Sequence, residues 1–264
     1  VRSEGSITVP AKLITGYVAL LSDEKVELSV VDGMNLALDS NSSHTKIKGI
    51  SADEFPLIPK VEKGQVVKVE TNILHDAIVE TVFAASVNTS RPVLSGVYML
   101  ASKNNLKLVA TDSYRLAEKI ITVTKGSEEE ISCIVPARTM MELSKILAKA
   151  DAKELEINIV KNQVLFKIGG VELVSRLIDG KYPDYEKIIP LEKKSEVEVS
   201  VEDLSLVLKR VSLFARENNN SVKLTVTNDG KMLVTSEETK VGEEKAELFI
   251  RMKGDNNKIS LNAQ

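Results

Sequence analysis

Few side chains in this chain could take part in catalysis, and their spacing does not assemble a catalytic site. The two histidines, His44 and His75, lie far apart, and neither has a partner at metal-ligand spacing. The single cysteine, Cys133, precedes Ile134 and Val135, and this apolar setting favours a buried, inert thiol over a nucleophile. A phosphate-binding Gly-rich loop, a pair of catalytic carboxylates and a Ser-His-Asp order are all absent from the sequence. We therefore predict a protein that is not an enzyme and holds no metal or other cofactor.

A different group of polar side chains lies in the stretch ATDSYRLA (residues 110–117). Tyr114 and Arg115 follow the end of an apolar strand there, in a short polar turn. Taken alone, the stretch has two interpretations. It is either a plain turn whose arginine makes a structural ion pair, or an exposed loop that binds a partner.

The composition is that of an ordinary globular protein. The 264 residues are 43% apolar and 28% charged, with a formal net charge of −3, so overall charge gives no argument for nucleic acid. No apolar run approaches the roughly 18 residues of a membrane helix, and no signal peptide is visible. A single cysteine is typical of a reducing compartment, so we expect a cytoplasmic location.

Hydrophobic periodicity predicts helices that alternate with short antiparallel strands. The helices are expected around residues 14–21, 73–85, 138–150 and 201–216. Hairpin turns are expected at Asp32-Gly33, Asn104-Asn105, Lys161-Asn162, Gly169-Gly170 and Asn228-Asp229-Gly230. Strands are expected at 7–10, 26–30, 36–38, 46–50, 97–102, 106–112, 115–123, 222–227, 232–238, 245–252 and 258–261, with a three-strand meander after the helix at 138–150. A helix layer on antiparallel sheets is an α+β arrangement.

The sequence repeats itself over a long period. ITVPAKLITGYVALL near the start matches CIVPARTMMELSKIL, and Pro10 lies about 126 residues before Pro136. Pro56 matches Pro183 in the same way, and Leu74 and Leu204 begin the same amphipathic pattern. The period predicts whole domains in tandem: residues 1–63 as the back half of one domain, 64–192 as a complete domain, and 193–264 as the front half of a third.

The predicted helices carry basic faces at equivalent points of this repeat. The basic residues are Arg138, Lys145 and Lys149 on one helix, interrupted by Glu142, and Lys209 and Arg210 on the next. On charge alone a solvated face explains them. The repeat favours a second interpretation, in which several weakly basic faces point the same way and hold duplex DNA through its phosphates without reading bases.

Four motifs together resemble one family. NTSRPVLSG (88–96), VATDSYRLA (109–117), IVPAR (134–138) and SRLIDGKYPDYEKIIP (175–190) are similar to the bacterial DNA polymerase III beta subunit, the sliding clamp. The resemblance covers the whole chain in order. It implies tandem repeats of the DNA-clamp fold, a homodimeric ring around duplex DNA, and a role as the non-catalytic processivity subunit of the DNA polymerase III holoenzyme.

The resemblance also implies roles for individual residues. A hydrophobic cleft would dock short peptides of the replicative polymerase, the clamp loader and repair proteins, at Leu94, Thr111, Ser113, Tyr114, Arg115, Leu116, Pro183, Lys187 and Ile188. Tyr114 stands where the family usually has His, and Lys187 where Arg is common. DNA would face Asn88, Arg91 and the basic helix residues named above, and Ile47, Leu213 and Phe214 would lie at the subunit joint.

Relative to the family, the chain is expected to lack about half of the first domain and half of the third. Two functions follow from this expectation. The first is a sliding clamp, or a fragment of one, that encircles duplex DNA and docks partner peptides. The alternative is a truncated clamp-like interaction module that binds clamp partners without forming a ring. No membrane association is expected.

Overall fold

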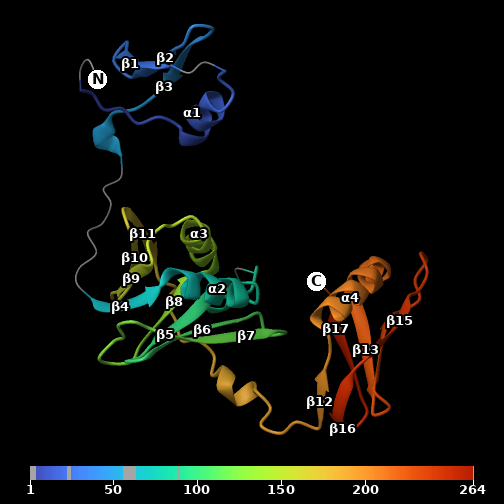
Figure 1. The fold of residues 1–264 in the computed structure, drawn as a ribbon. Helices are drawn as coiled ribbons and strands as arrows, with labels where there is room; N and C mark the ends of the chain where they lie inside the picture. Colours follow the sequence, from blue (N-terminus) through green and yellow to red (C-terminus); the bar gives the residue numbers. More distant parts are fainter. Residues whose placement is uncertain (1–3, 23–24, 56–63, 89, 264) are drawn as a thin grey trace. The chain divides into compact units, whose positions relative to one another are not determined.

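The computed structural model describes residues 4–22, 25–55, 64–88 and 90–263 (Figure 1). The chain consists of two compact units, residues 1–182 and 183–264, because most residue contacts are made within each unit. The predicted boundary at residues 192/193 lies inside the second unit, and the one near residue 63 lies at the edge of a range outside the described residues. Both domain boundaries stay predictions. Within the described ranges, no helix is long and apolar enough to cross a membrane.

The N-terminal part of the first unit is one helix with a three-stranded antiparallel sheet. The elements are α1 (Ala11–Val18), β1 (Glu27–Val31), β2 (Asn35–Asp39), β3 (His44–Lys48) and the short 3₁₀ helix η1 (Ala52–Glu54). The strands pair in the order β1-β2-β3. Asp32 and Gly33 have φ of 48° and 79°, as a two-residue type I′ hairpin requires, so the predicted turn is confirmed.

Residues 65–176 of the same unit form two four-stranded antiparallel sheets. The first has the order β7 (Leu116–Thr122), β6 (Asn105–Thr111), β5 (Gly96–Ala101), β8 (Ile131–Pro136). The second has the order β11 (Val171–Arg176), β10 (Gln163–Ile168), β9 (Glu154–Ile159), β4 (Gln65–Glu70).

The two halves of this central region exchange their first strands. β4 comes directly before the first helix, yet it pairs with β9 of the second half, with Val67 opposite Ile157. β8 comes before the second helix, yet it pairs with β5 of the first half, with Met99 opposite Cys133. Neither half is therefore a closed unit of one helix and its own sheet, because each sheet takes its fourth strand from the other half.

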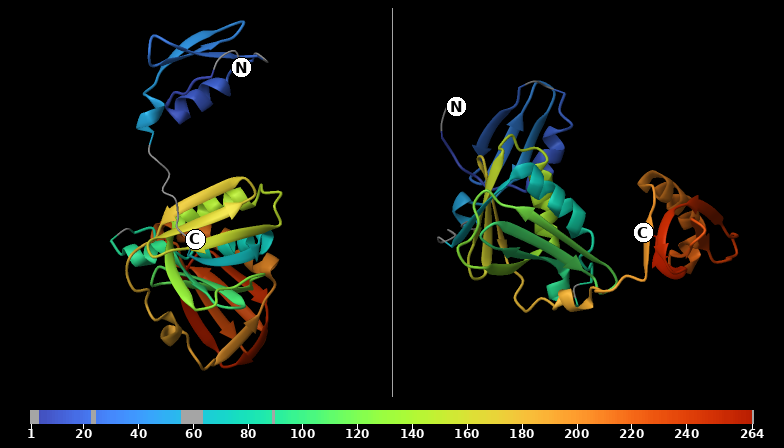
Figure 2. Two further views of the ribbon diagram at one scale, coloured as in Figure 1. Left: turned by 90° about the vertical axis from the view of Figure 1, so that its left-hand side faces the viewer. Right: turned by 60° about the horizontal axis from the view of Figure 1, so that its bottom comes forward.

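Two helices share one core with both sheets. α2 (Thr71–Val82) and α3 (Ala137–Leu147) pack against each other and against the first sheet (Figures 1 and 2). The predicted apolar stripes are confirmed, since Leu74 and Ile78 of α2 and Met140 and Leu143 of α3 are fully buried. Phe166 of the second sheet belongs to the same cluster. Burying such side chains supplies most of the stability of a domain of this size.

The sequence repeat has a counterpart in the hydrogen bonds. In the central region the Ile178 amide donates to the Ile134 carbonyl at 2.8 Å, just before α3. At the equivalent place before α1 the Ile50 amide donates to the Thr8 carbonyl at 2.9 Å. The strand predicted over Ile7–Pro10 is reduced to this one bridge. This equivalent hydrogen bond, together with the matching strand orders β1-β2-β3 and β9-β10-β11, indicates that the N-terminal part and the second half of the central region share one structural module.

The second unit repeats the topology of the first central sheet. Its elements are η3 (Tyr185–Ile188), β12 (Ser195–Glu198), α4 (Val201–Ala215), η4 (Arg216–Asn218), β13 (Ser221–Thr227), β14 (Lys231–Ser236), β15 (Lys245–Phe249), β16 (Arg251–Gly254) and β17 (Asn257–Asn262). The order β15-β14-β13-β17 matches β7-β6-β5-β8, while β12 pairs with β16. Ser200 caps α4 by accepting a hydrogen bond from the Asp203 amide, and Val207 and Val211 bury the helix against the sheet.

Candidate functional site

The turn between β6 and β7 is held by its own side chains. One oxygen of the Asp112 carboxylate accepts hydrogen bonds from the Tyr114 and Arg115 amides, both at 2.9 Å. The Thr111 hydroxyl donates to the Arg115 carbonyl at 2.7 Å and accepts from the Ser113 amide at 3.2 Å. This network fixes Ser113 at φ 80°, a conformation that costs a residue with a side chain and that recurs at binding sites.

The charge of Asp112 is stabilised by the turn. Burial alone would raise the pKa of Asp112, but hydrogen bonds from the Arg115 and Tyr114 amides, with the Arg115 charge, outweigh it and lower the pKa. The carboxylate is therefore ionised at neutral pH and holds the loop closed.

Arg115 makes the structural ion pair of the first interpretation, and its exposure is compatible with the second. Its Nε lies 3.1 Å from the Asp112 carboxylate, so the structural ion pair is present. The guanidinium also lies over the ring of Phe83, 5.7 Å from the centroid, and about half of the side chain stays exposed. Tyr114 beside it is 97% exposed. An oriented arginine and an exposed aromatic ring are the residue types that dominate protein interfaces.

A second loop meets this turn. Arg91 donates from Nη1 to the Ser113 hydroxyl at 3.2 Å. Leu94, in the 3₁₀ helix η2 (Pro92–Ser95), is 5% exposed, and its carbonyl accepts from the Ser86 amide. The structure therefore brings the predicted peptide residues Leu94 and Ser113 to neighbouring loops. Arg91 was predicted to face DNA, but its side chain contacts Ser113 in the turn between β6 and β7.

The segment after β11 covers the face of the first sheet that points away from the helices. Ile178 packs where Gly96 leaves room, since a Cβ at Gly96 would lie 2.8 Å from the Ile178 side chain. Tyr182 stacks on Tyr98 of β5, with ring centroids 5.1 Å apart and 19° between the planes.

Sequence reasoning missed three aromatic rings, those of Tyr98, Tyr182 and Phe83. Tyr182 lies in the motif at residues 175–190, and the alternation of residues along 97–102 places Tyr98 on the face of the sheet opposite to Val97 and Met99. Both rings could therefore have been noticed in the sequence. Partners so distant along the chain cannot be read from local periodicity.

Three of the predicted peptide residues belong to the second unit. Lys187 makes a 2.5 Å ion pair with Asp184, and this hydrogen bond and charge raise the pKa of Lys187. Ile188 is exposed, as is Pro183. That Pro183, Lys187 and Ile188 complete one cleft with the turn stays a prediction.

The predicted DNA-facing residues differ in how strongly other side chains hold them. Asn88 shapes its loop, because its side-chain oxygen accepts from the Ser90 amide at 2.9 Å. Lys145 is paired with Glu142 at 2.9 Å, and Arg210 lies 3.4 Å from Glu244. The remaining cations of the set are exposed: Arg138 on α3, Lys209 on α4, and Lys149 in the turn just after α3, where the helix was predicted to continue. Exposed pairs of this kind are weak, so they leave the cations available to a phosphate.

The residues predicted for the subunit joint are of two kinds. Leu213 of α4 is exposed and Phe214 is half-buried, so both can take part in a contact. Ile47 is only 3% exposed, because it packs with Leu36 and Leu38 in the core of the N-terminal part. The Ile47 side chain therefore offers no surface, and any joint at β3 would use the backbone of that strand. That Ile47, Leu213 and Phe214 lie at a subunit joint stays a prediction.

The chemistry of the other reactive groups matches a structural role. Cys133 is buried, and burial raises its thiol pKa to about 12, so the thiolate nucleophile does not form at neutral pH. Among the described residues no cluster of three or more His, Cys, Asp or Glu could hold a metal ion.

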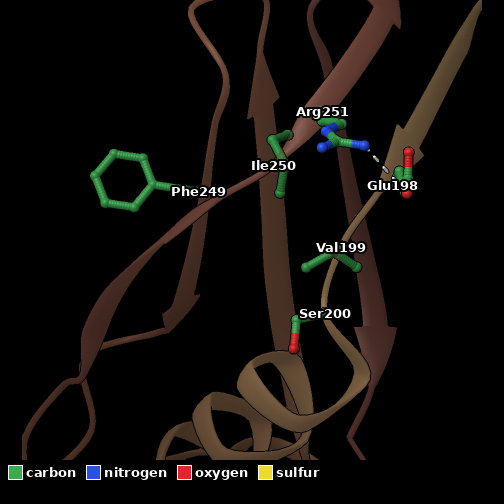
Figure 3. A pocket seen from close by; sticks show the side chains of 6 residues that line it. All are labelled: Glu198, Val199, Ser200, Phe249, Ile250 and Arg251. Atoms are coloured by element: carbon green, nitrogen blue, oxygen red, sulfur yellow. Dashed lines mark ion pairs between the residues drawn. The ribbon is translucent and has the colours of Figure 1, made fainter.

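A pocket in the second unit lies where β15, β16 and the start of α4 meet (Figure 3). It is lined by Glu198, Val199, Ser200, Phe249, Ile250 and Arg251. Arg251 and Glu198 form an ion pair at 3.7 Å, and Ser200 is the helix cap. These residues serve the fold and do not form a reactive constellation.

A family model described as the central domain of the DNA polymerase III beta subunit matches residues 68–184, and one described as its C-terminal domain matches residues 186–264. The beta sliding clamp of Staphylococcus epidermidis is 31% identical over the whole chain, which covers 70% of that protein. The chain belongs to the DNA polymerase III beta subunit family.

Solved structures of beta subunits confirm the clamp fold. The Thermotoga maritima beta subunit matches with a TM-score of 0.88 and 31% identity, over 99% of this chain and 70% of that one. The Bacillus subtilis sliding clamp matches with a TM-score of 0.89 and 32% identity, over 98% of this chain and 68% of that one. The resemblance inferred from the four motifs and the predicted α+β clamp fold are both confirmed.

Proposed function

We propose that this beta subunit homologue acts as a sliding clamp that tethers the replicative polymerase to duplex DNA and docks partner peptides beside the turn Asp112–Arg115. Family membership supports the clamp function itself. The observation that supports the docking site is the junction of two loops, in which Arg91 reaches Ser113 and Leu94 lies buried beside them.

The turn suits a partner that binds as a short peptide. Thr111 and Asp112 use their side chains to close the loop, which leaves Tyr114 and the outer face of Arg115 exposed. Leu116 follows at the start of β7 and is half-buried. A rigid loop that presents one aromatic ring, one oriented cation and an apolar floor loses little entropy when a peptide binds.

DNA would be held by backbone electrostatics and shape. A net charge of −3 cannot attract DNA as a whole, so the contact must come from local cations such as Arg138, Lys149 and Lys209. Contacts with phosphates alone carry no sequence information, which suits a protein that moves along the duplex.

The assembly follows from the family rather than from this chain. We propose that the chain is non-catalytic, works in the cytoplasm as part of a DNA polymerase III holoenzyme, and closes as a homodimer. Its peptide partners would be the polymerase, the clamp loader and repair proteins.

The docking site is tested by peptide binding. A fluorescently labelled peptide from the clamp-binding segment of the Bacillus subtilis replicative polymerase is titrated with the protein, and anisotropy gives the Kd. Arg115→Ala and Leu116→Ala should each weaken binding by about tenfold or more, the range of an interface anchor. Lys161→Ala, in an exposed turn of the second central sheet, serves as the control and should leave Kd unchanged. If neither Arg115→Ala nor Leu116→Ala changes the Kd, the proposed docking site is wrong.

Encirclement is tested separately. A closed ring stays on nicked circular DNA and slides off the ends of linear DNA, so retention in gel filtration should differ between the two. Equal, low retention on both would favour an interaction module that does not close around DNA.

A further inference from the structure

A buried tyrosine near the predicted peptide residues has a hydroxyl group without a well-formed hydrogen bond. Tyr182 is 7% exposed, and its hydroxyl oxygen has no exposed surface. Among the described residues no group makes a hydrogen bond of normal geometry with this hydroxyl, although the Thr111 backbone lies near it. Buried polar groups without a partner are rare in folded proteins, so each one calls for an explanation.

The ring that carries this hydroxyl is fixed in place. The ring stacks on Tyr98. Two residues earlier, Gly180 has φ 133° and lets the backbone pass close to Val93, since a Cβ at Gly180 would lie only 2.7 Å from the Val93 side chain. The Ile178 amide anchors the same segment to β8. Rotation of the ring toward another partner would break the stack, so the hydroxyl is held where it is.

The hydroxyl lies near the end of β6, at Thr111. Thr111, one of the predicted peptide residues, is close enough for its backbone to affect the hydroxyl, and the β5–β6 pairing ends nearby at Tyr98↔Val109. Burial raises the pKa of Tyr182 to about 12, and the Thr111 backbone offsets this only in part. The group is therefore protonated at neutral pH and can donate a hydrogen bond.

We propose that the Tyr182 hydroxyl is a binding donor, which hydrogen-bonds a main-chain carbonyl oxygen of the bound partner peptide and so contributes to its affinity. The proposal rests on the peptide-docking function above. A peptide that inserts apolar side chains between Leu94 and Leu116 also buries its own carbonyl groups, and each needs a donor. Reaching the hydroxyl requires a side-chain movement at the cleft surface, of the size common when proteins bind.

The substitution Tyr182→Phe tests this, because it removes only the hydroxyl. Peptide affinity, measured with the polymerase peptide described above, should fall about five- to tenfold, as expected for one neutral hydrogen bond. The melting temperature of the peptide-free protein should rise by about 2–4 °C, because an unpaired buried group is removed. Tyr98→Phe removes a hydroxyl from the other ring of the stack and should change the affinity less than twofold.

A scan of the peptide sharpens the test. In a set of peptides, one carbonyl oxygen at a time is replaced by sulfur, a weaker acceptor. One replacement should weaken binding to the wild-type protein but not to Tyr182→Phe. If the wild type binds the peptide and Tyr182→Phe binds it equally well, the inference is wrong while the docking site stands. If the wild type does not bind, the docking function itself fails, and the inference with it.

Discussion

The first central sheet and the sheet of the second unit have the same strand order and one helix in the same place, yet they differ in the loop after the second strand. In the central region this loop is residues 112–115, closed by Asp112 and strained at Ser113. In the second unit it is residues 237–244, closed by paired bonds between Thr239 and Gly242. The repeated sheet is therefore a common frame, and the proposed docking site depends on a short loop that only one of the two copies has.

The helices of the two copies differ in burial. Leu74 and Ile78 of α2 are fully buried, while the matching Leu204 and Leu208 of α4 are half-buried. α2 packs against α3 as well as against its sheet. Helix-to-helix packing in the central region therefore explains the extra burial.

The largest expected effect tests this difference in burial. Leu74→Ala should lower the free energy of unfolding by about 2–5 kcal/mol, because it leaves a cavity in a closed core. Leu204→Ala removes a side chain that is already half-exposed and should cost less than about 1.5 kcal/mol. Hydrogen-exchange mass spectrometry of peptides from α2 and α4 reports each region separately. Equal losses would contradict the comparison.

A smaller effect is expected from the strain in the turn. Ser113→Gly should be more stable than Ser113→Ala by about 1–2 kcal/mol, because both lose the hydroxyl but only glycine adopts φ 80° without cost. Glu238→Gly, in the longer loop of the second unit, has no positive φ to relieve and should bring no gain. Urea unfolding of the three variants provides the measurement. A Ser113→Gly protein no more stable than Ser113→Ala would show that the turn is unstrained.

The smallest effect concerns the charge that closes the turn. The folded pKa of Asp112 lies below its unfolded value of 3.8, so its contribution is fully present above that value and is lost as pH falls through the folded pKa. Asp112→Asn should therefore cost about 1 kcal/mol at pH 7 and less in strong acid. Unfolding measured between pH 2 and pH 7 would show this, with Glu129→Gln in an exposed loop as the control. A constant difference across that range would mean that the hydrogen bonds, not the charge, hold the loop.

Local patterns predicted the elements well. Helix stripes such as Leu74–Ile78 and turns such as Asp32-Gly33 follow from side-chain periodicity and from backbone rules that act over a few residues. β4 and β12 were missed because each lies beside a predicted domain boundary, in a stretch whose polar residues indicate a linker. The exchange of β4 and β8 could not be predicted, since nothing local to a strand states which distant strand it will pair with. The same limit hid the contact of Tyr98 with Tyr182 and that of Phe83 with Arg115.

The crossed first strands have a consequence for synthesis. β4 leaves the ribosome long before its partner β9, so its apolar Val67 and Val69 wait without a sheet until residues 154–159 have been made. At about 5–20 residues per second the delay is roughly 4–18 s. During this interval β4 has only its backbone bonds to residues 124–125 available, so its pairing as a sheet strand comes late in synthesis.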